Sequence, residues 1–357
     1  MKDSKKESIT FRTTKELKDA LQRMADKDKR TLSNTIEVLL ESAVKSSGMK
    51  TFKNILDFQK EFSNEEKCRE YLEQQRWNGT PACAFCGSLN VHRFPNGKIF
   101  KCREKQCRQK FSVLVGSVYQ NTKIPLTKWF LATYILTIHS KGLSTLQLSK
   151  LLGVSLKCTW HLTHRIREML NDKSPELLDG VVEVDETLIG GSLSNIHASK
   201  KKRLNLKRDD NKTMVFGAIQ RNGKVRTKVI SDVNIENISE ALSDFVAVDS
   251  FMVSDENRAY NRVGEKYKHR KVNHRNGEYV KQEDILVHTN SIESYWNVLK
   301  KQIDGIHHSV SPKHLQRYCN ENSFRFNNRE LFQDERFAAA IANCQGELKF
   351  KQLTGKE

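Results

Sequence analysis

The fold is decided by VVEVD (181–185), SFMVSD (250–255) and TNSIESYWNVLKKQIDGI (289–306). The first two stretches are short β-branched and apolar runs that end in an acid, and such runs are typical of buried strands. The third stretch has the apolar spacing of an amphipathic helix. The sequence therefore predicts two strands and a later helix that all belong to one sheet-containing domain.

A hairpin and a further helix complete this domain. MVFGAIQ (214–220) and KVRTKVI (224–230) flank an Asn-Gly pair, which is a strong hairpin signal. Residues 234–247, NIENISEALSDFVA, have the pattern of a helix. Strands and helices thus alternate over residues 178–330, and this pattern predicts an α/β domain.

Three acids are placed so that they can meet. Asp185 and Asp255 end their strands, and Glu293 lies on the later helix. Ligand sites gather at the carboxyl ends of parallel strands, and three carboxylates there can hold two Mg²⁺ (or Mn²⁺) ions that promote phosphodiester cleavage. Each acid alone also has a structural interpretation, as a turn residue or as part of a solvated helix face. The set predicts a catalytic site.

Two neighbours of Glu293 strengthen this interpretation. Lys300 follows Glu293 by two helical turns, and Asn290 precedes it by three residues, so both share its face of the helix. Glu183 lies one step inside the strand that carries Asp185, and we expect it to be structural.

The segment PACAFCGSLNVHRFPNGKIFKCREKQCRQKFSV (81–113) carries two pairs of closely spaced cysteines with a short hairpin between them. Four thiolates complete a tetrahedral structural zinc site, which has no open position for chemistry. The alternative is four ordinary reduced cysteines. The expected Zn²⁺ ligands are Cys83, Cys86, Cys102 and Cys107.

The stretch LSTLQLSKLLGVSLKCTWHLTHRIREML (143–170) predicts two helices joined by a turn at Gly153. A helix, a glycine-containing turn and a basic second helix describe a helix-turn-helix, and the alternative is a bridging helical hairpin. The second helix is expected to expose polar residues in part, and Lys157 and Arg165 are candidate DNA contacts. The other polar residues expected to be partly exposed on this helix are Thr159, His161, His164 and Arg167.

Residues 1–48 form a module of their own. An alternating segment at residues 8–12 predicts a strand, and two amphipathic helical patterns follow it. The pattern resembles the ribbon-helix-helix family, in which two chains pair their strands and place them in the major groove. The resemblance implies that Ser8, Thr10 and Arg12 face bases; the alternative is a plain helical hairpin.

The composition points to nucleic acid. The chain has 357 residues, a net charge of +18 and 37% hydrophobic residues. Such an excess of Lys and Arg favours an anionic partner. No apolar run is long enough to span a membrane, and the first residues lack the pattern of a signal peptide, so we expect a cytoplasmic, nucleoid-associated protein of a bacterium or archaeon. A basic stretch, Lys200, Lys201, Lys202 and Arg203, is expected to be a flexible loop that meets phosphates.

Four segments carry the strongest resemblance to a known family: KFSVLVGSVYQNTKIPLTKWF, VEVDETLIGG, VSDENRAY and HTNSIESYWNVLKK. They resemble DDE insertion-sequence transposases of the ISXO-like branch, from about residue 60 to residue 330. The resemblance implies an RNase H-like mixed sheet with helices on both sides. It also implies that Asp185, Asp255 and Glu293 ligate the catalytic metals and that Lys300 contacts DNA, with Asn290 as a rival or accessory for the third position.

A transposase implies double-stranded DNA partners, the terminal inverted repeats and the target, and a homodimer or larger homo-oligomer. Two alternatives remain: a structure-selective nuclease, and a DNA-binding regulator with an inactive catalytic domain. The sequence divides into a ribbon-helix-helix (1–48), a helical connector (49–79), a zinc ribbon (80–115), a helix-turn-helix (120–172), the catalytic domain (178–330) and a polar tail (331–357).

Overall fold

The computed structural model describes residues 13–27, 30–46, 52–173, 175–191, 194, 196–203, 205, 211–257, 259–260, 266–272 and 287–355. The chain divides into two compact units, Met1–Thr51 and Phe52–Glu357. The first unit contains two helices. The second contains a zinc-ribbon region, a helical region and a five-stranded sheet.

The helices of the first unit are α1 (Lys15–Lys27) and α2 (Leu32–Ser46), as the sequence predicts. They contact each other, yet Leu17 and Leu40 remain about half exposed, at 51% and 49%. Two short helices bury little core. The expected strand residues Ser8, Thr10 and Arg12 lie outside the described residues, so the ribbon-helix-helix stays a prediction.

The second unit begins with α3 (Ile55–Glu61) and α4 (Glu65–Trp77), whose first turns are capped by the side chains of Asn54 and Asn64. A three-stranded antiparallel sheet follows, formed by β1 (Val91–Arg93), β2 (Phe100–Cys102) and β3 (Lys110–Phe111). Three helices come next: α5 (Leu126–Ile138), α6 (Thr145–Leu152) and α7 (Leu156–Met169).

The helical region has an aromatic core that joins distant parts of the chain. Phe58 of α3 stacks on Tyr134 of α5, with ring centroids 4.4 Å apart, and Phe337 contacts both Phe58 and Phe130. Phe337 lies on α13 (Gln333–Ala342). The expected polar tail at 331–357 is therefore wrong in part, because α13 supplies buried Phe337, Ala340 and Ile341 to this core. A last short helix, α14 (Phe350–Thr354), follows.

The α/β domain has a mixed sheet with strand order β6-β5-β4-β7-β8. β4, β5 and β6 are antiparallel neighbours, whereas β7 runs parallel to β4 and β8 parallel to β7. This mixed α/β arrangement agrees with the expected RNase H-like sheet. The strands are β4 (Val181–Ile189), β5 (Thr213–Gln220), β6 (Val225–Ile230), β7 (Phe251–Ser254) and β8 (Arg270–Lys271).

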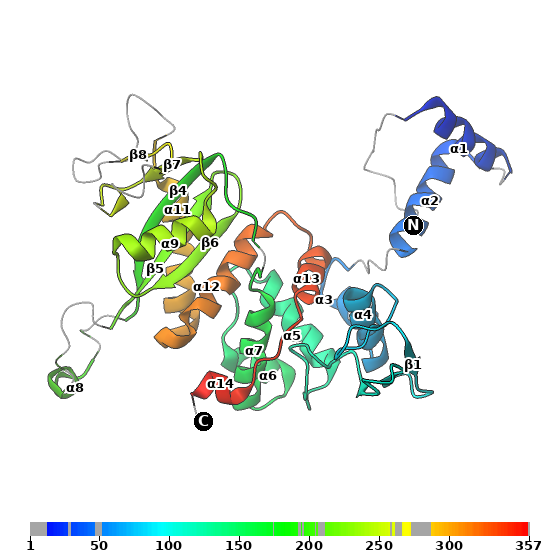
Figure 1. The fold of residues 1–357 in the computed structure, drawn as a ribbon, viewed down its shortest axis with the longest axis horizontal. Coiled ribbons are helices and arrows are strands. Elements are labelled where there is room, and N and C mark those ends of the chain that lie inside the picture. Colours follow the sequence, from blue (N-terminus) through cyan, green and yellow to red (C-terminus); the bar gives the residue numbers. More distant parts are fainter. Residues whose placement is uncertain are drawn as a thin grey trace. The chain divides into compact units, whose positions relative to one another are not determined.

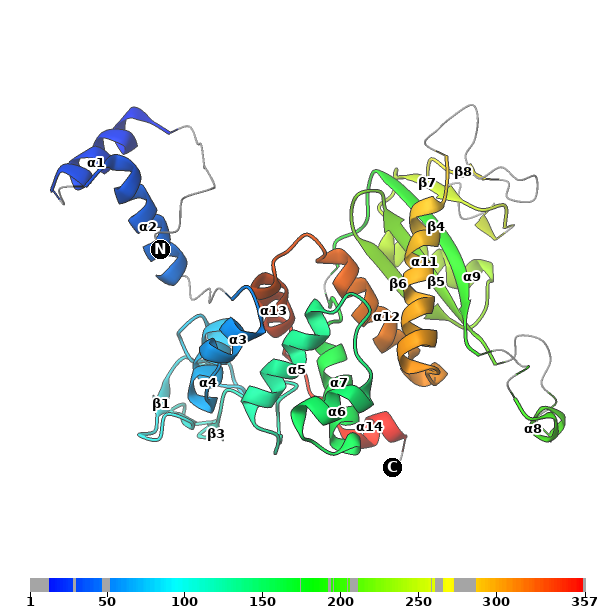
Figure 2. The same ribbon diagram turned by 180° about the vertical axis from the view of Figure 1, so that it is seen from behind.

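Helices cover both faces of this sheet. α9 (Ile235–Phe245) packs on one face, and α11 (Asn290–Gln302) with α12 (Pro312–Asn327) packs on the other, which Figures 1 and 2 show from opposite sides. The alternation of side chains along each strand supplies both cores: Val182 and Val184 face α9, and Val215 and Ile219 face α11. A π-helical turn, η4 (Ile303–His307), extends α11.

The outer edge of β6 is closed by amide side chains of α12. Asn327 accepts a hydrogen bond from the backbone N–H of Val225 (2.7 Å) and donates one to its carbonyl oxygen (3.0 Å). Gln316 accepts from the N–H of Val229 (2.7 Å) and donates to the carbonyl of Thr227 (2.9 Å). These contacts occupy groups that a further strand would otherwise pair with, so the edge is protected.

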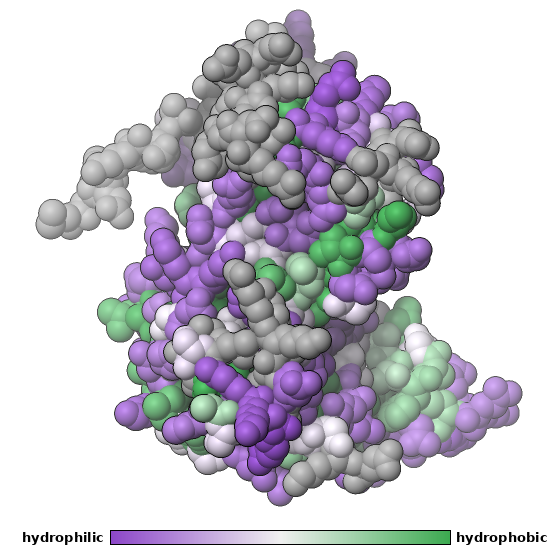
Figure 3. Space-filling view, turned by 90° about the vertical axis from the view of Figure 1, so that its left-hand side faces the viewer, coloured by the Kyte–Doolittle hydropathy of each residue, from purple (hydrophilic) through white to green (hydrophobic). Residues whose placement is uncertain are grey.

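The visible surface is largely polar. Hydrophilic side chains cover much of the face seen in Figure 3, with hydrophobic residues scattered among them. Among the described helices, none has both the length and the apolar character needed to cross a membrane.

Candidate active site

The acids of the sheet lie on neighbouring parallel strands. β4 pairs with β7 from Val181↔Phe251 to Glu183↔Val253, and Asp255 follows β7 directly. Asp185 does not end its strand, as the sequence suggested, but lies within β4, because pairing with β5 continues to Ile189. Asp185 thus lies just beyond the point where the pairing with β7 stops, level with Asp255.

Glu293 is brought to this place by the anchoring of α11. The carboxylate of fully buried Glu183 accepts hydrogen bonds from the backbone N–H of Ser291 (2.8 Å) and of Ile292 (3.1 Å), and Arg221 pairs with it at 2.8 Å. An acid at a helix N-terminus satisfies free backbone donors and complements the helix dipole. Glu183 is therefore structural, as expected, and it fixes the first turn of α11 on β4. Half-buried Glu293 lies in that turn.

A second contact fixes α11 further along. The indole nitrogen of Trp296 donates a hydrogen bond to Asp185 (3.0 Å), while the ring packs against the sheet. The close approach requires Gly217 on β5, since a Cβ there would lie 2.5 Å from two ring atoms of Trp296. Trp296 thus packs the helix on the sheet and also orients a candidate catalytic acid.

The electrostatics of the acids show concentrated negative charge. The pKa of Asp185 is raised to about 7, chiefly by burial and further by the charges of Asp255 and Glu293. The pKa of Glu186 is raised to about 8, chiefly by burial and also by Asp185 and Asp255, although the buried hydroxyl of Tyr260 donates a hydrogen bond to it. A divalent cation would relieve this repulsion, and hard oxygen donors are the ligands that Mg²⁺ prefers.

The acids do not form as tight a group as the cysteines do. Among the described residues, Cys83, Cys86, Cys102 and Cys107 are the set of metal-binding side chains whose ligand atoms all lie within 4.8 Å of one another. Asp185, Asp255 and Glu293 stay a predicted ligand set, supported by their shared place at the sheet.

The two accessory residues of α11 are exposed. Asn290 opens the helix and Lys300 lies two turns beyond Glu293. His288 caps the same helix end: its Nδ1 lies 3.4 Å from the backbone nitrogen of Asn290 and 3.4 Å from Glu183. That Glu293, and not Asn290, is the third ligand remains a prediction. The half-buried position of Glu293 and the effect of its charge on Asp185 support it.

The cysteines fit a tetrahedral zinc ion. The sulfur atoms of Cys83 and Cys107 are 3.7 Å apart, and those of Cys86 and Cys102 are 3.6 Å apart. Four sulfurs at about 2.3 Å from a zinc ion lie about 3.8 Å from one another. Phe100 and Phe111 stack beside the site and form the core of the ribbon.

Residues 143–170 form the two expected helices and the turn at Gly153, but they do not present the expected surface. α6 ends at Gly153 in the left-handed conformation and α7 begins after Ser155. The expectation that α7 exposes Arg165 is wrong: it is 6% exposed, and its guanidinium donates to the carbonyl of Gln120 (2.6 Å). Other polar residues expected at the surface, Thr159, His164 and Arg167, are also buried.

The physical reason is packing on two sides: Arg165 lies over the ring of Trp129 on α5, and the C-terminal part of the chain covers other residues of α7. The ring of His314 on α12 lies 4.7 Å from that of His164. Phe350 of α14 lies beside exposed Lys157 (5.2 Å) and beside His161 (5.4 Å). Only the first turn of α7 therefore keeps exposed side chains.

The basic stretch after β4 is not a plain loop, because it contains a short helix, α8 (Ala198–Arg203). Lys201 is half-buried, whereas Lys202 and Arg203 are exposed; the side chain of Lys200 lies outside the described part. Gly190 packs closely on the backbone of Asn211, because a Cβ at Gly190 would lie 2.5 Å from the Asn211 carbonyl oxygen. The two ends of the segment between β4 and β5 therefore lie side by side.

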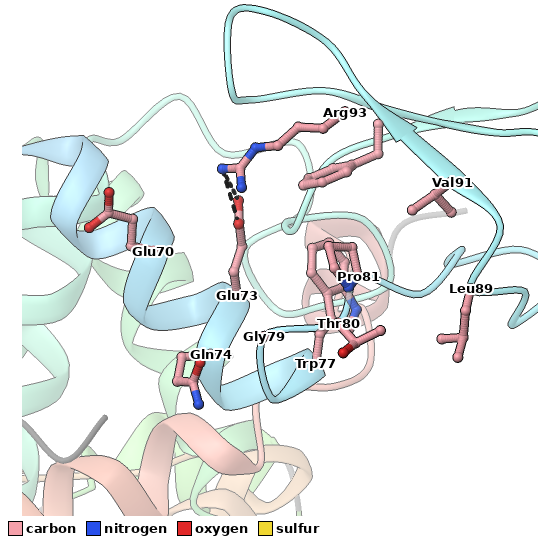
Figure 4. A pocket seen from close by; sticks show the side chains of 11 residues that line it. Glu70, Glu73, Gln74, Trp77, Gly79, Thr80, Pro81, Leu89, Val91 and Arg93 are labelled. Carbon is pink, nitrogen blue, oxygen red and sulfur yellow. Dashed lines mark hydrogen bonds and ion pairs between the residues drawn. The ribbon is translucent and has the colours of Figure 1, made fainter. Parts of the chain in front are cut away.

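A separate cleft lies between α4 and the ribbon (Figure 4). It has a volume of about 500 Å³, and Glu73 and Arg93 form an ion pair of 3.1 Å within it. Trp77 and Leu89 supply apolar walls. None of the three acids lines this cleft, so it is distinct from the candidate active site.

Sequence reasoning missed residues that support the acids. Gly217 and Arg221 were not singled out, although a glycine inside a strand signals close approach of another group. Tyr260 was also missed, and its partner Glu186 lies 74 residues away in the sequence.

Two family models and a relative match this chain. Residues 177–327 match the model of the ISXO2-like transposase domain, and residues 63–110 match that of the transposase zinc-ribbon domain. The chain is 27% identical over 286 residues to an uncharacterized protein in transposable element ISH50 of Halobacterium salinarum. The match covers 76% of this chain and 93% of that protein.

Among solved structures, the chain is similar to a chain of the simian T-cell lymphotropic virus intasome in complex with PP2A regulatory subunit B56 gamma. The two are 12% identical, and the match covers 49% of this chain and 63% of that one, less than two thirds of its length, with a TM-score of 0.24. A score this low carries no argument.

Proposed function

From the ISXO2-like DDE transposase domain that this chain carries over residues 177–327, we propose that it cuts the ends of an insertion sequence and joins them to target DNA. The proposal is supported by the placement of Asp185 and Asp255 beyond the β4–β7 pairing, with Glu293 in the first turn of α11, whose Trp296 donates a hydrogen bond to Asp185. The zinc-ribbon domain and the net charge of +18 support a DNA partner.

The acids would hold the catalytic cations. Bound to Asp185, Asp255 and Glu293, two Mg²⁺ or Mn²⁺ ions would activate the nucleophile and stabilise the leaving oxygen of a phosphodiester. The protein's own contribution is orientation. Trp296 holds the Asp185 carboxylate, and Glu183 holds the helix that bears Glu293.

Two displacements follow in the same site. In the first, a water oxygen bonds to phosphorus at the element's end, the bond from phosphorus to the 3′ oxygen breaks, and that oxygen takes a proton to become a 3′ hydroxyl. In the second, the oxygen of this hydroxyl gives up its proton and bonds to a target phosphorus, while the bond from that phosphorus to the target's own 3′ oxygen breaks and this oxygen takes up a proton. The number of phosphodiester bonds is conserved in the joining step, so it needs no external energy source.

Several basic residues would hold the DNA. Exposed Lys300, Lys202 and Arg203 and the first turn of α7 with Lys157 are candidates, together with Lys200 and Lys201. Arg165 is not among them, because it is buried. We also infer that the N-terminal module dimerises and reads bases through Ser8, Thr10 and Arg12, an inference that rests on the sequence pattern and the exposed apolar side chains of α1 and α2.

Replacement of each acid tests the proposal. Asp185→Asn, Asp255→Asn and Glu293→Gln remove one charge with little change of shape, so each should abolish cleavage and joining of element-end duplexes, by orders of magnitude. Glu236→Gln, an exposed acid in the first turn of α9, is the matched control and should act like the parent. Mg²⁺ or Mn²⁺ should support turnover, and Ca²⁺ should support binding more than turnover.

The outcomes separate the alternatives. Retained activity in Glu293→Gln with lost activity in Asn290→Ala would move the third ligand to Asn290. A parent protein that binds element ends but cuts no DNA with either metal would favour the regulator. Cleavage that ignores the element's ends would favour the nuclease.

A further inference from the structure

Helix α11 is held on the sheet at two points, so its outer face has a fixed position beside the acids. Glu183 binds the backbone of Ser291 and Ile292 in the first turn, and Trp296 reaches Asp185 in the second. The inward face is buried through Ile292, Trp296 and Leu299. A side chain on the outer face therefore points in a direction that the packing fixes.

The outer face carries an ordered set of polar residues. Glu293 is half-buried, whereas Asn297 and Lys300, four and seven residues further on, are exposed. With 3.6 residues per turn, Asn297 lies about 40° around the helix from Glu293 and Lys300 about 20°, at about 6 Å and about 10 Å along the axis. Exposed Ser294 lies about 100° around the helix from Glu293, further from the line between Glu293 and Lys300 than Asn297 does.

We propose that Asn297 is a positioning residue for DNA, whose side-chain amide contacts the backbone of the element's end strand between the acids and Lys300. This inference rests on the proposed function, because it assumes that the scissile phosphodiester lies at Asp185, Asp255 and Glu293. A strand that joins that point to Lys300 crosses the turn of α11 that bears Asn297.

An amide suits this place for a physical reason. Asn donates hydrogen bonds to phosphate oxygens without adding charge, so it neither repels DNA nor competes with cations for the neighbouring carboxylates. Phosphate contacts set the register of a protein on DNA. Asn297 would therefore determine which phosphodiester reaches the acids, in addition to contributing affinity.

A charge comparison on one helix tests the inference in the full-length protein. Asn297→Asp and Ser294→Asp add the same charge at exposed positions that lie about 40° and about 100° around the helix from Glu293. Binding of an element-end duplex is measured in Ca²⁺, and cleavage in Mg²⁺ with the cut mapped to the nucleotide. Asn297→Asp should weaken binding about tenfold more than Ser294→Asp, since a carboxylate beside a phosphate is repulsive. Asn297→Ala should add cuts at neighbouring phosphodiesters, which a merely structural residue would not cause, and Asn297→Gln should restore the parental cut.

The results separate this inference from the proposed function. Equal binding and identical cut positions in Asn297→Asp and Ser294→Asp, with an active parent, would overturn the role of Asn297 and leave the transposase proposal intact. If the parent cuts no DNA but Asn297→Asp still binds more weakly than Ser294→Asp, the contact stands and the catalytic proposal fails. Both positions are exposed, so the thermal midpoints of the variants should match that of the parent.

Discussion

Trp296 and Asp185 are joined by a hydrogen bond of 3.0 Å from the indole nitrogen to the carboxylate, so a helix side chain orients a strand acid. Asp185 pairs with Gly217 on β5, and the Trp296 ring lies over that glycine. Packing and chemistry therefore depend on the same contact. A larger side chain at position 217 should therefore displace the Trp296 ring and change the orientation of the Asp185 carboxylate without contacting Asp185 itself.

Gly217→Ala is expected to impair both stability and cleavage. The new Cβ would lie 2.5 Å from the Trp296 ring, and overpacking of this kind costs about 1–3 kcal/mol. Displacement of the ring also withdraws the hydrogen-bond donor from Asp185. Thermal denaturation and element-end cleavage measure the two effects. Gly305→Ala, where a Cβ meets no atom within 4 Å, is the control, and equal behaviour of the two variants would contradict the packing argument.

Lys300→Ala should weaken DNA binding more than Lys301→Ala does. Both lysines are exposed, but Lys300 lies about 20° around the helix from Glu293 and Lys301 about 80°. An ammonium neutralises phosphate and does not ligate a cation, so the metal dependence of cleavage should be unchanged. Titration of binding against salt should give a shallower slope for Lys300→Ala. Identical slopes for both variants would identify Lys300 as an ordinary solvated residue.

One zinc ion per chain should be present in protein purified without chelators. Sulfur separations of 3.6 and 3.7 Å match a tetrahedral site, and removal of the ion would leave thiolates that repel one another. Metal analysis and thiol titration measure occupancy. Cys102→Ser should lose the ion, whereas Cys158→Ser, an exposed thiol on α7, should keep it. Four freely titratable thiols in the parent, with no zinc, would disprove the site.

Local patterns in the sequence predicted the sheet well. The Asn222-Gly223 hairpin, the helix at 234–247 and the helix that bears Glu293 all follow from short-range periodicity and turn chemistry, and the structure contains each of them. The length of β4 was underestimated because Asp185 and Glu186 interrupt its apolar pattern. Strand pairing with β5 overrides that interruption.

Long-range packing explains the failures. α7 has the sequence of an exposed basic helix, yet α12 and α14, which lie more than a hundred residues later, cover it. The apolar residues of α13, Phe337, Ala340 and Ile341, do have helical spacing, so that signal was present in the supposed tail. The ion pair between Arg167 and Glu321 spans 154 residues, and no local pattern reveals it.

Glu321→Gln should destabilise the second unit strongly. Glu321 is fully buried between Arg167 at 2.6 Å and Arg325 at 2.5 Å. Although burial alone would raise its pKa, the two arginines lower the pKa of Glu321 to about 2. Removal of one partner leaves buried positive charge without compensation, which costs about 3–5 kcal/mol. Calorimetry should show a lowered thermal midpoint.

The pH dependence gives an independent check on this variant. A carboxylate whose pKa is lowered on folding stabilises the protein above its ordinary pKa, and this contribution is lost as the pH falls toward the folded value. The difference between parent and Glu321→Gln should therefore be full at neutral pH and shrink in acid. Glu330→Gln, which breaks the exposed pair with Arg329, should change the midpoint little at any pH. A difference for Glu321→Gln that stays constant down to acid pH would show that shape, and not charge, is what Glu321 contributes.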